Sequence, residues 1–111
     1  MASAPADPGL VTFINVFELD PDLVDDFIVG WRHRGEIMRK QPGFRSFHLY
    51  RAQSSDSSYQ LVNVAEWDNA EALRAAAQNE EFQASIRETA ARFHAVAHPG
   101  VYLTVEAVVQ H

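Results

Sequence analysis

The sequence has no cysteine, a single lysine and no long apolar run. Without cysteine, the chain forms no disulfide and carries no thiolate nucleophile, iron–sulfur ligand or thiolate zinc ligand. Acidic residues outnumber basic ones by 15 to 9, and nucleic-acid or anionic membrane surfaces need clustered Lys and Arg. No stretch approaches the roughly 18 apolar residues of a membrane span. We therefore expect neither nucleic acid nor a membrane as a partner.

The remaining composition is that of one globular domain. The 111 residues include 47% apolar and 22% charged side chains, which are ordinary values for a folded protein. Residues 1–8 are small and rich in Pro and Ala, with neither the basic start nor the apolar run of a secretory signal. We expect a flexible tail over residues 1–8, a single domain over residues 9–111, and a cytoplasmic location.

Four β-rich runs alternate with helical patterns along the domain. Strands are expected over residues 10–19, 44–52, 59–67 and 101–109. The first helix is expected to begin at Asp20 and Pro21, because an N-cap residue there precedes proline at the first helical position. Its apolar spacing continues until Pro42, which cannot extend a helix.

The second helical region is expected to be broken in two. Asp68 or Asn69 can cap a short first part, and Asn79 can cap a second part. The region is expected to end at His98 and Pro99, where a turn signal precedes the last strand.

The resulting order, βαββαβ, is the split βαβ arrangement of ferredoxin-like folds. The predicted class is therefore α+β, with a four-stranded antiparallel sheet and both helical regions on one face. The other face is also apolar, with Ile14, Val16, Val62 and Val64. A second copy can cover it sheet against sheet, so we expect a homodimer in the form of a dimeric α+β barrel. The alternative is a half-exposed β-branched surface.

Three polar-tipped side chains fall on the face that should meet the helices. Asn15 shares this face on the first strand, and Asn63 and Trp67 lie four residues apart on the third. Because these strands are neighbours in a split βαβ sheet, the three side chains can converge on a bound ligand. Alternatively, each asparagine bonds a nearby backbone group and Trp67 is part of the core.

Three short stretches resemble the antibiotic biosynthesis monooxygenase family: Val11–Asn15, Gln41–Phe44 and Val62–Trp67. The resemblance spans nearly the whole chain and is greatest to the small cofactor-independent anthrone oxygenases of aromatic polyketide pathways. These enzymes pair a first-strand asparagine with an Asn-x-x-x-Trp strand. Asn15, Asn63 and Trp67 occupy those places in this chain.

The resemblance implies a monooxygenase that oxidises an anthrone or phenolic polycyclic substrate to a quinone with molecular oxygen and no cofactor. The amides of Asn15 and Asn63 would stabilise an oxyanion, and Trp67 would orient the rings. An arginine that some members use on the last helix corresponds to Arg87. A tyrosine that some members place six residues after the tryptophan is Leu73 here, so that phenol is not available as a proton donor.

Apolar side chains expected to bind the substrate are Phe13, Phe17, Phe27, Trp31, Leu61, Phe82 and Ile86. No general base is predicted, because His33 and His48 are isolated, and a lone histidine is more often a structural residue than a catalyst. His94 and His98 have the spacing of helical metal ligands, but no third ligand is evident, so no metal is predicted.

Other activities use the same scaffold. Haem-degrading relatives need a histidine on the helix after the tryptophan, and none occurs between Asp68 and Thr89. A polyketide cyclase or isomerase, or a non-catalytic small-ligand-binding protein, remains an alternative because a pocket of amides and aromatic rings suits each of them.

Overall fold

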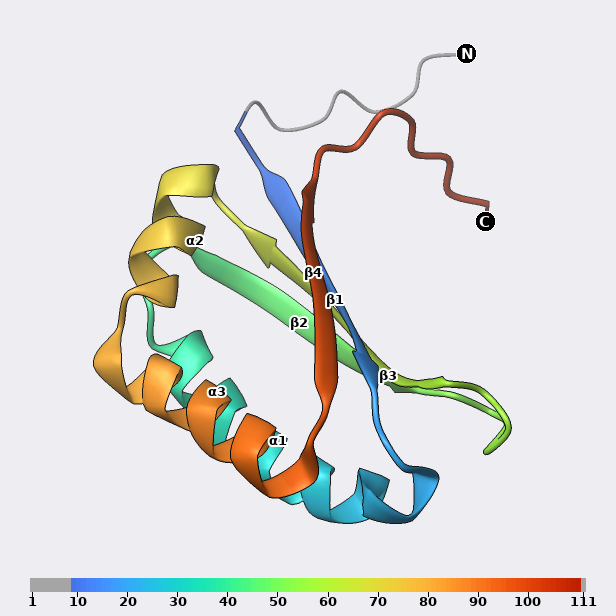
Figure 1. Cartoon of the computed structure of the whole chain (residues 1–111). Helices are drawn as coiled ribbons and strands as arrows, with labels where there is room; N and C mark the ends of the chain where they lie inside the picture. The colour runs from blue at the N-terminus through green and yellow to red at the C-terminus, as the bar shows by residue number, and fades with distance from the viewer. Residues whose placement is uncertain (1–8, 111) are drawn as a thin grey trace.

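The computed structural model describes residues 9–110 and has the predicted βαββαβ order (Figure 1). The expected flexible tail, residues 1–8, lies outside the described residues. The elements are β1 (Val11–Glu18), the short 3-10 helix η1 (Pro21–Leu23), α1 (Val24–Arg39), β2 (Phe44–Arg51), β3 (Tyr59–Trp67), α2 (Ala70–Ala77), α3 (Glu80–Phe93) and β4 (Val96–Tyr102). The expected break in the second helical region is confirmed, because α2 and α3 are separate helices.

The four strands form one antiparallel sheet in the order β2-β3-β1-β4, with the helices on one face (Figure 1). The predicted α+β ferredoxin-like fold is therefore confirmed. In the β1–β3 pairing Asn15 lies opposite Asn63, and Val11 lies opposite Trp67. Residues directly opposite each other in an antiparallel pair point to the same face of the sheet, so the two asparagines share one face. That face is the one covered by the helices.

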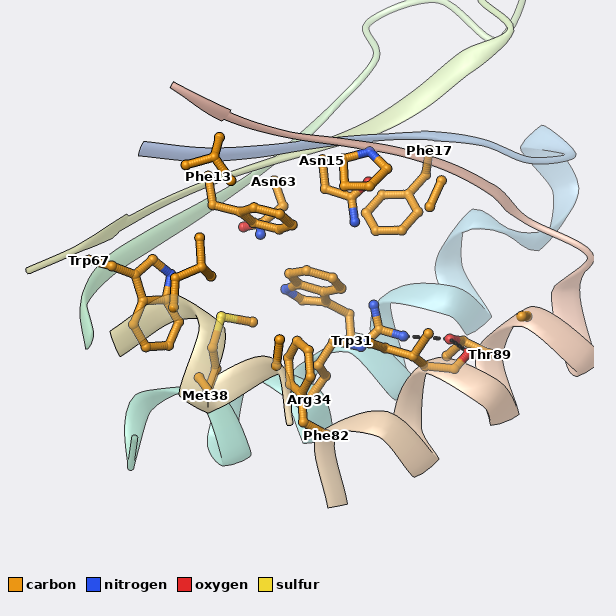
Figure 2. Close-up of a pocket in the computed structure, with 18 of the residues that line it drawn as sticks. Phe13, Asn15, Phe17, Trp31, Arg34, Met38, Asn63, Trp67, Phe82 and Thr89 are labelled. Carbon is orange, nitrogen blue, oxygen red and sulfur yellow. Dashed lines mark hydrogen bonds between the residues drawn. The ribbon is translucent and has the colours of Figure 1, made fainter. Parts of the chain in front are cut away.

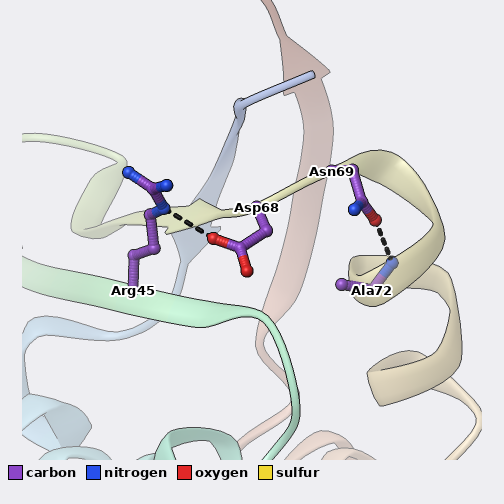
Figure 3. A network of polar contacts seen from close by, with 4 residues as sticks. All are labelled: Arg45, Asp68, Asn69 and Ala72. Carbon is purple, nitrogen blue, oxygen red and sulfur yellow. Dashed lines mark hydrogen bonds and ion pairs between the residues drawn. The ribbon is translucent and has the colours of Figure 1, made fainter. Parts of the chain in front are cut away.

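Side-chain caps lie at the predicted places, although the first of them starts the 3-10 helix η1, and α1 follows from Val24 without a side-chain cap of its own. The Asp20 carboxylate accepts a hydrogen bond of 2.9 Å from the Asp22 amide at the start of η1. Asn69, rather than Asp68, caps α2: its Oδ1 accepts from the Ala72 amide at 2.8 Å (Figure 3). Asp68 instead forms an ion pair of 2.6 Å with Arg45 of β2 (Figure 3).

The last strand differs from the prediction. Helix α3 ends at Phe93, where His94 adopts a left-handed conformation with φ of 53° and its amide bonds the Ala90 carbonyl. The strand then occupies Val96–Tyr102, and residues 103–110 are outside it. Pro99 is tolerated because β4 is an edge strand that pairs with β1 alone, so one side needs no N–H donor.

The observed position of β4 places His94 and His98 on different elements. His98 lies on β4 and not on a helix, where its imidazole contacts the Glu18 carboxylate of β1 at 2.5 Å. His94 forms the C-cap of α3. The two residues therefore do not have the i, i+4 geometry of helical ligands.

Aromatic side chains fill one end of the space between sheet and helices. The Phe27 ring of α1 lies 5.2 Å from Phe17 of β1 and 5.5 Å from Phe93 of α3, measured between centroids. Trp31 packs edge-on against Phe17 at 5.7 Å. Such pairs each add about 0.5–1.5 kcal/mol beyond the buried area, so this cluster fixes α1 and α3 against the sheet.

No helix covers the second face of the sheet in the described part of the chain (Figure 1). Ile14, Val16, Val62 and Val64 lie there, half-buried by their neighbours alone. Within residues 9–110, no helix combines the length and the apolar character needed to cross a membrane.

Candidate active site

A cavity of about 600 Å³ lies between the helix-facing side of the sheet and the helices (Figure 2). Strands β1, β3 and β4 form its roof, and α1, α2 and α3 form its floor and sides. Its lining is mostly aromatic and aliphatic, and its volume is within the range of small-molecule sites.

Most of the predicted site residues meet in this cavity. They are Asn15, Asn63, Trp67, Phe13, Phe17, Phe27, Trp31, Phe82 and Ile86. Strand alternation explains the sheet residues, because β1 and β3 each present every second side chain to the helices. Leu73 also lines the cavity, so an aliphatic side chain occupies the place where some relatives are expected to have a tyrosine.

Two predicted residues lie outside the lining. Leu61 is fully buried in the core and does not line the cavity, although it points to the same side of β3 as Asn63. Arg87 is exposed on α3. Its neighbour Ile86 faces the cavity, and successive helix residues are rotated by about 100°, so the two cannot share one direction.

Several buried polar atoms of the cavity lining lack a hydrogen-bond partner in the described part of the chain. Among the described residues, no hydrogen bond is made by the buried Oδ1 of Asn15, either amide atom of Asn63, or the indole nitrogens of Trp31 and Trp67. Figure 2 shows the asparagines pointing from the sheet toward Trp31. The alternative in which Asn63 is satisfied by a backbone group is therefore wrong. A ligand with both donors and acceptors would complement this set.

Arg34 is a buried cavity residue that the sequence patterns did not single out. It lies on α1 with 4% of its surface exposed. Its Nε donates to Ser85 Oγ at 3.4 Å, and its Nη2 donates to the Ser85 carbonyl and to Thr89 Oγ1. The guanidinium carbon lies 5.0 Å from the centroid of Trp31, as in a cation–π contact.

A sequence signal for Arg34 was present. Phe27, Trp31, Arg34 and Met38 follow the i, i+4, i+7, i+11 spacing of one helix face, and all four line the cavity. An arginine within an otherwise apolar stripe predicts a buried cation with a specific task.

The cavity is electropositive although the chain is acidic. Arg34 and Arg74 are the ionisable residues of the lining, which contains no carboxylate, histidine or tyrosine among the described residues. Burial lowers the pKa of Arg34 to about 10, which leaves the side chain protonated at neutral pH. The lining thus supplies amide and indole donors and one buried positive charge, but no general base.

The sequence profile of the antibiotic biosynthesis monooxygenase family matches residues 10–88, well over half of the chain. The chain belongs to this family. In this monooxygenase-family chain the family-like stretches occupy the start of β1, the α1–β2 turn and most of β3. Gly43 in that turn has φ of 84°, and a Cβ there would come 2.5 Å from Cβ of Ala72. The glycine allows α2 to pack on the turn.

Solved structures share the fold. SnoaB, a cofactor-independent oxygenase from Streptomyces nogalater, is 23% identical with a TM-score of 0.79, covering 92% of this chain and 99% of SnoaB. A candidate monooxygenase from Shewanella loihica is 27% identical with a TM-score of 0.74, covering 89% and 97%. Rv0793 from Mycobacterium tuberculosis is 16% identical with a TM-score of 0.74, covering 91% and 100%. No curated protein sequence matches the chain closely enough to add a function.

Proposed function

We propose that this monooxygenase-family protein oxidises an anthrone or phenolic polycyclic substrate to a quinone with molecular oxygen and no cofactor. The observation that carries the proposal is the group of unpartnered amide and indole atoms inside an apolar cavity of about 600 Å³. Flat aromatic rings suit the apolar walls, and hydroxyl and carbonyl oxygens on those rings suit the unpartnered atoms.

The chemistry balances without an added electron carrier. The substrate loses a proton to give an electron-rich enolate, which passes one electron to oxygen; the resulting radical and superoxide combine to a peroxide. Cleavage of the O–O bond with loss of the remaining hydrogen on that carbon forms the new carbonyl and releases water. One substrate and one O₂ therefore give one quinone and one water, and the substrate supplies all the electrons.

The protein would supply position and electrostatics. The Nδ2 of Asn63 is a free donor on the cavity roof, fixed by its place on β3, and can donate to an oxyanion that forms in the ring system. The indole N–H of Trp67 is a second free donor on the same strand, and its ring is a wall against which the substrate can stack. Asn15, directly opposite Asn63, offers an acceptor for a substrate hydroxyl.

The test is oxygen uptake by metal-free protein on addition of the anthrone dithranol, with absorbance spectra to follow the quinone. We expect uptake above the spontaneous rate, insensitive to chelator, and reduced by about 100-fold or more in Asn63→Ala. Gln60→Ala, at a buried residue of the same strand outside the cavity, is the matched control and should retain the rate. Binding of dithranol with no uptake would contradict the oxygenase and favour a cyclase or a binding protein.

We also propose a homodimer, with a cytoplasmic location. The uncovered sheet face carries Ile14, Val16, Val62 and Val64, together with the exposed Tyr50. Burying an apolar face of this kind against a second copy follows the commonest two-fold arrangement of soluble chains.

A further inference from the structure

The buried guanidinium of Arg34 is only partly satisfied by the protein. Its Nε and Nη2 donate to Ser85 and Thr89 of α3, whereas Nη1 has no hydrogen-bond partner among residues 9–110. No carboxylate of the described residues lies within ion-pair distance of it. A cation that is 4% exposed and has no counterion carries a desolvation cost that an anionic ligand would offset.

The main cavity gives room for such a ligand beside Arg34, which is part of its lining. Toward α3 it meets the neutral hydroxyls of Ser85 and Thr89. Toward the sheet it faces the cavity below Asn15, beside the ring of Trp31 (Figure 2).

No charged residue near the cavity acts as a counterion for Arg34 in the described part of the chain. Arg74 of α2 is the other charged residue of the lining. His33, Glu88 and Arg92 line a separate small hollow between α1 and α3, and none of the three forms an ion pair with Arg34. Positive charge thus faces the cavity in a chain whose formal charge is −6.

The hydroxyl groups of α3 hold the guanidinium in this direction. Thr89 Oγ1 accepts from Arg34 and in turn lies 3.0 Å from the carbonyl oxygens of Ser85 and Ile86, to which it can donate. Ser85 and Thr89 are therefore positioning residues, one helical turn apart. They leave Nη1 as the free end that faces the cavity.

We infer that the cavity binds its aromatic ligand as a phenolate or enolate, with the ionised oxygen at Nη1 of Arg34. The aromatic nature of the ligand rests on the proposed function; the preference for an anion rests on Arg34. Because the lining has no carboxylate or histidine among the described residues, the ligand's proton leaves to solvent and no side chain of the cavity receives it. Arg34, on α1, thus takes the electrostatic role that the family resemblance assigned to Arg87 on α3.

The experiment measures binding without oxygen, so that it does not depend on turnover. The probes are 2-hydroxyanthraquinone, whose phenol ionises with a colour change, and its methyl ether, which cannot ionise. Binding is followed by quenching of tryptophan fluorescence across the pH range in which the phenol ionises. Wild-type protein should bind the phenolate about 10- to 100-fold more tightly than the ether, and the bound phenol should ionise at lower pH than the free one.

Substitutions of Arg34 and Arg87 test whether the preference for the phenolate depends on the positive charge inside the cavity. Arg34→Gln should lose the preference for the phenolate and keep its affinity for the ether, whereas Arg34→Lys should keep part of the preference. Arg87→Gln removes the same charge from the exposed side of α3 and should bind both probes as wild type does.

Each outcome is decisive. Equal affinity of the wild type for both probes, or a bound phenol that ionises at the same or higher pH, would overturn the inference even if Arg34→Gln failed to fold. An anion preference without oxygen uptake on dithranol would support the inference and contradict only the proposed oxygenase. Oxygen uptake on dithranol without an anion preference would support the proposed oxygenase and overturn the inference about Arg34.

Discussion

Replacing Asn63 by leucine should make the protein more stable and less active. Asn63 is 0% exposed, and neither atom of its amide has a hydrogen-bond partner among the described residues. An unsatisfied buried polar group costs about 1–3 kcal/mol, and an apolar side chain of similar shape removes that cost. Leucine faces the cavity, so its slightly larger volume meets open space. We expect Asn63→Leu to raise the free energy of unfolding by about 1–3 kcal/mol.

The expected increase in the free energy of unfolding of Asn63→Leu is large enough to measure. For a domain of this size, 1 kcal/mol shifts the melting temperature by about 4 °C, so calorimetry of the ligand-free protein should show a rise of at least about that amount. The matched control is Gln60→Leu on the same strand. Gln60 is 2% exposed, but its amide donates to carbonyls of the 53–58 turn, so its loss should lower stability by about 1–3 kcal/mol.

A loss of stability in Asn63→Leu would contradict an unsatisfied Asn63 amide. If Asn63→Leu lost more than about 1 kcal/mol while Gln60→Leu did not, the Asn63 amide would be satisfied in the folded protein and would not be held ready for a ligand. Activity gives the second readout. Oxygen uptake on dithranol should fall by about 100-fold or more in Asn63→Leu, because a free donor at the roof of the cavity is lost.

Three further predictions test separate parts of the structure. Trp67→Phe keeps a ring but removes the indole donor, so steady-state kinetics should show a larger fall in kcat than rise in KM; an unchanged kcat would make Trp67 a core residue only. Gly43→Ala should lower stability by about 1–3 kcal/mol in urea unfolding, since it combines φ of 84° with a contact 2.5 Å from Ala72; equal stability would contradict that turn geometry. Val16→Asp on the uncovered sheet face should convert a dimer to a monomer in light scattering, and a monomeric wild type would contradict the dimer.

The family stretches and the strand pattern predicted much of the site, because they are local. Alternation of side chains along β1 and β3 places Asn15, Asn63 and Trp67 on one face regardless of what covers that face. The antiparallel neighbours of a split βαβ sheet then bring the two asparagines opposite each other, as the structure has them. The caps of η1, α2 and α3 were predicted for the same reason, since a cap depends on a few adjacent residues.

Residues on helices could not be placed in the same way. The choice between Ile86 and Arg87 as the cavity residue depends on how α3 is rotated about its own axis, and packing against α1 decides that rotation. Arg34 was detectable as the one charged member of an apolar stripe. Its hydrogen bonds to Ser85 and Thr89, however, join residues more than 50 positions apart, which no local pattern reports.

Local sequence patterns were enough to predict the order of elements, the helix-facing sides of β1 and β3 and most helix starts, because these follow from preferences of a few neighbouring residues. The position of the last strand depends on long-range pairing. Hydrogen bonding to β1 stabilises an extended chain over Val96–Tyr102, and Pro99 is tolerated there because the outer edge of the sheet needs no N–H donor. The charge of the cavity was decided in the same way. It depends on which long side chain the packed helices turn inward, and that is a property of contacts between distant segments.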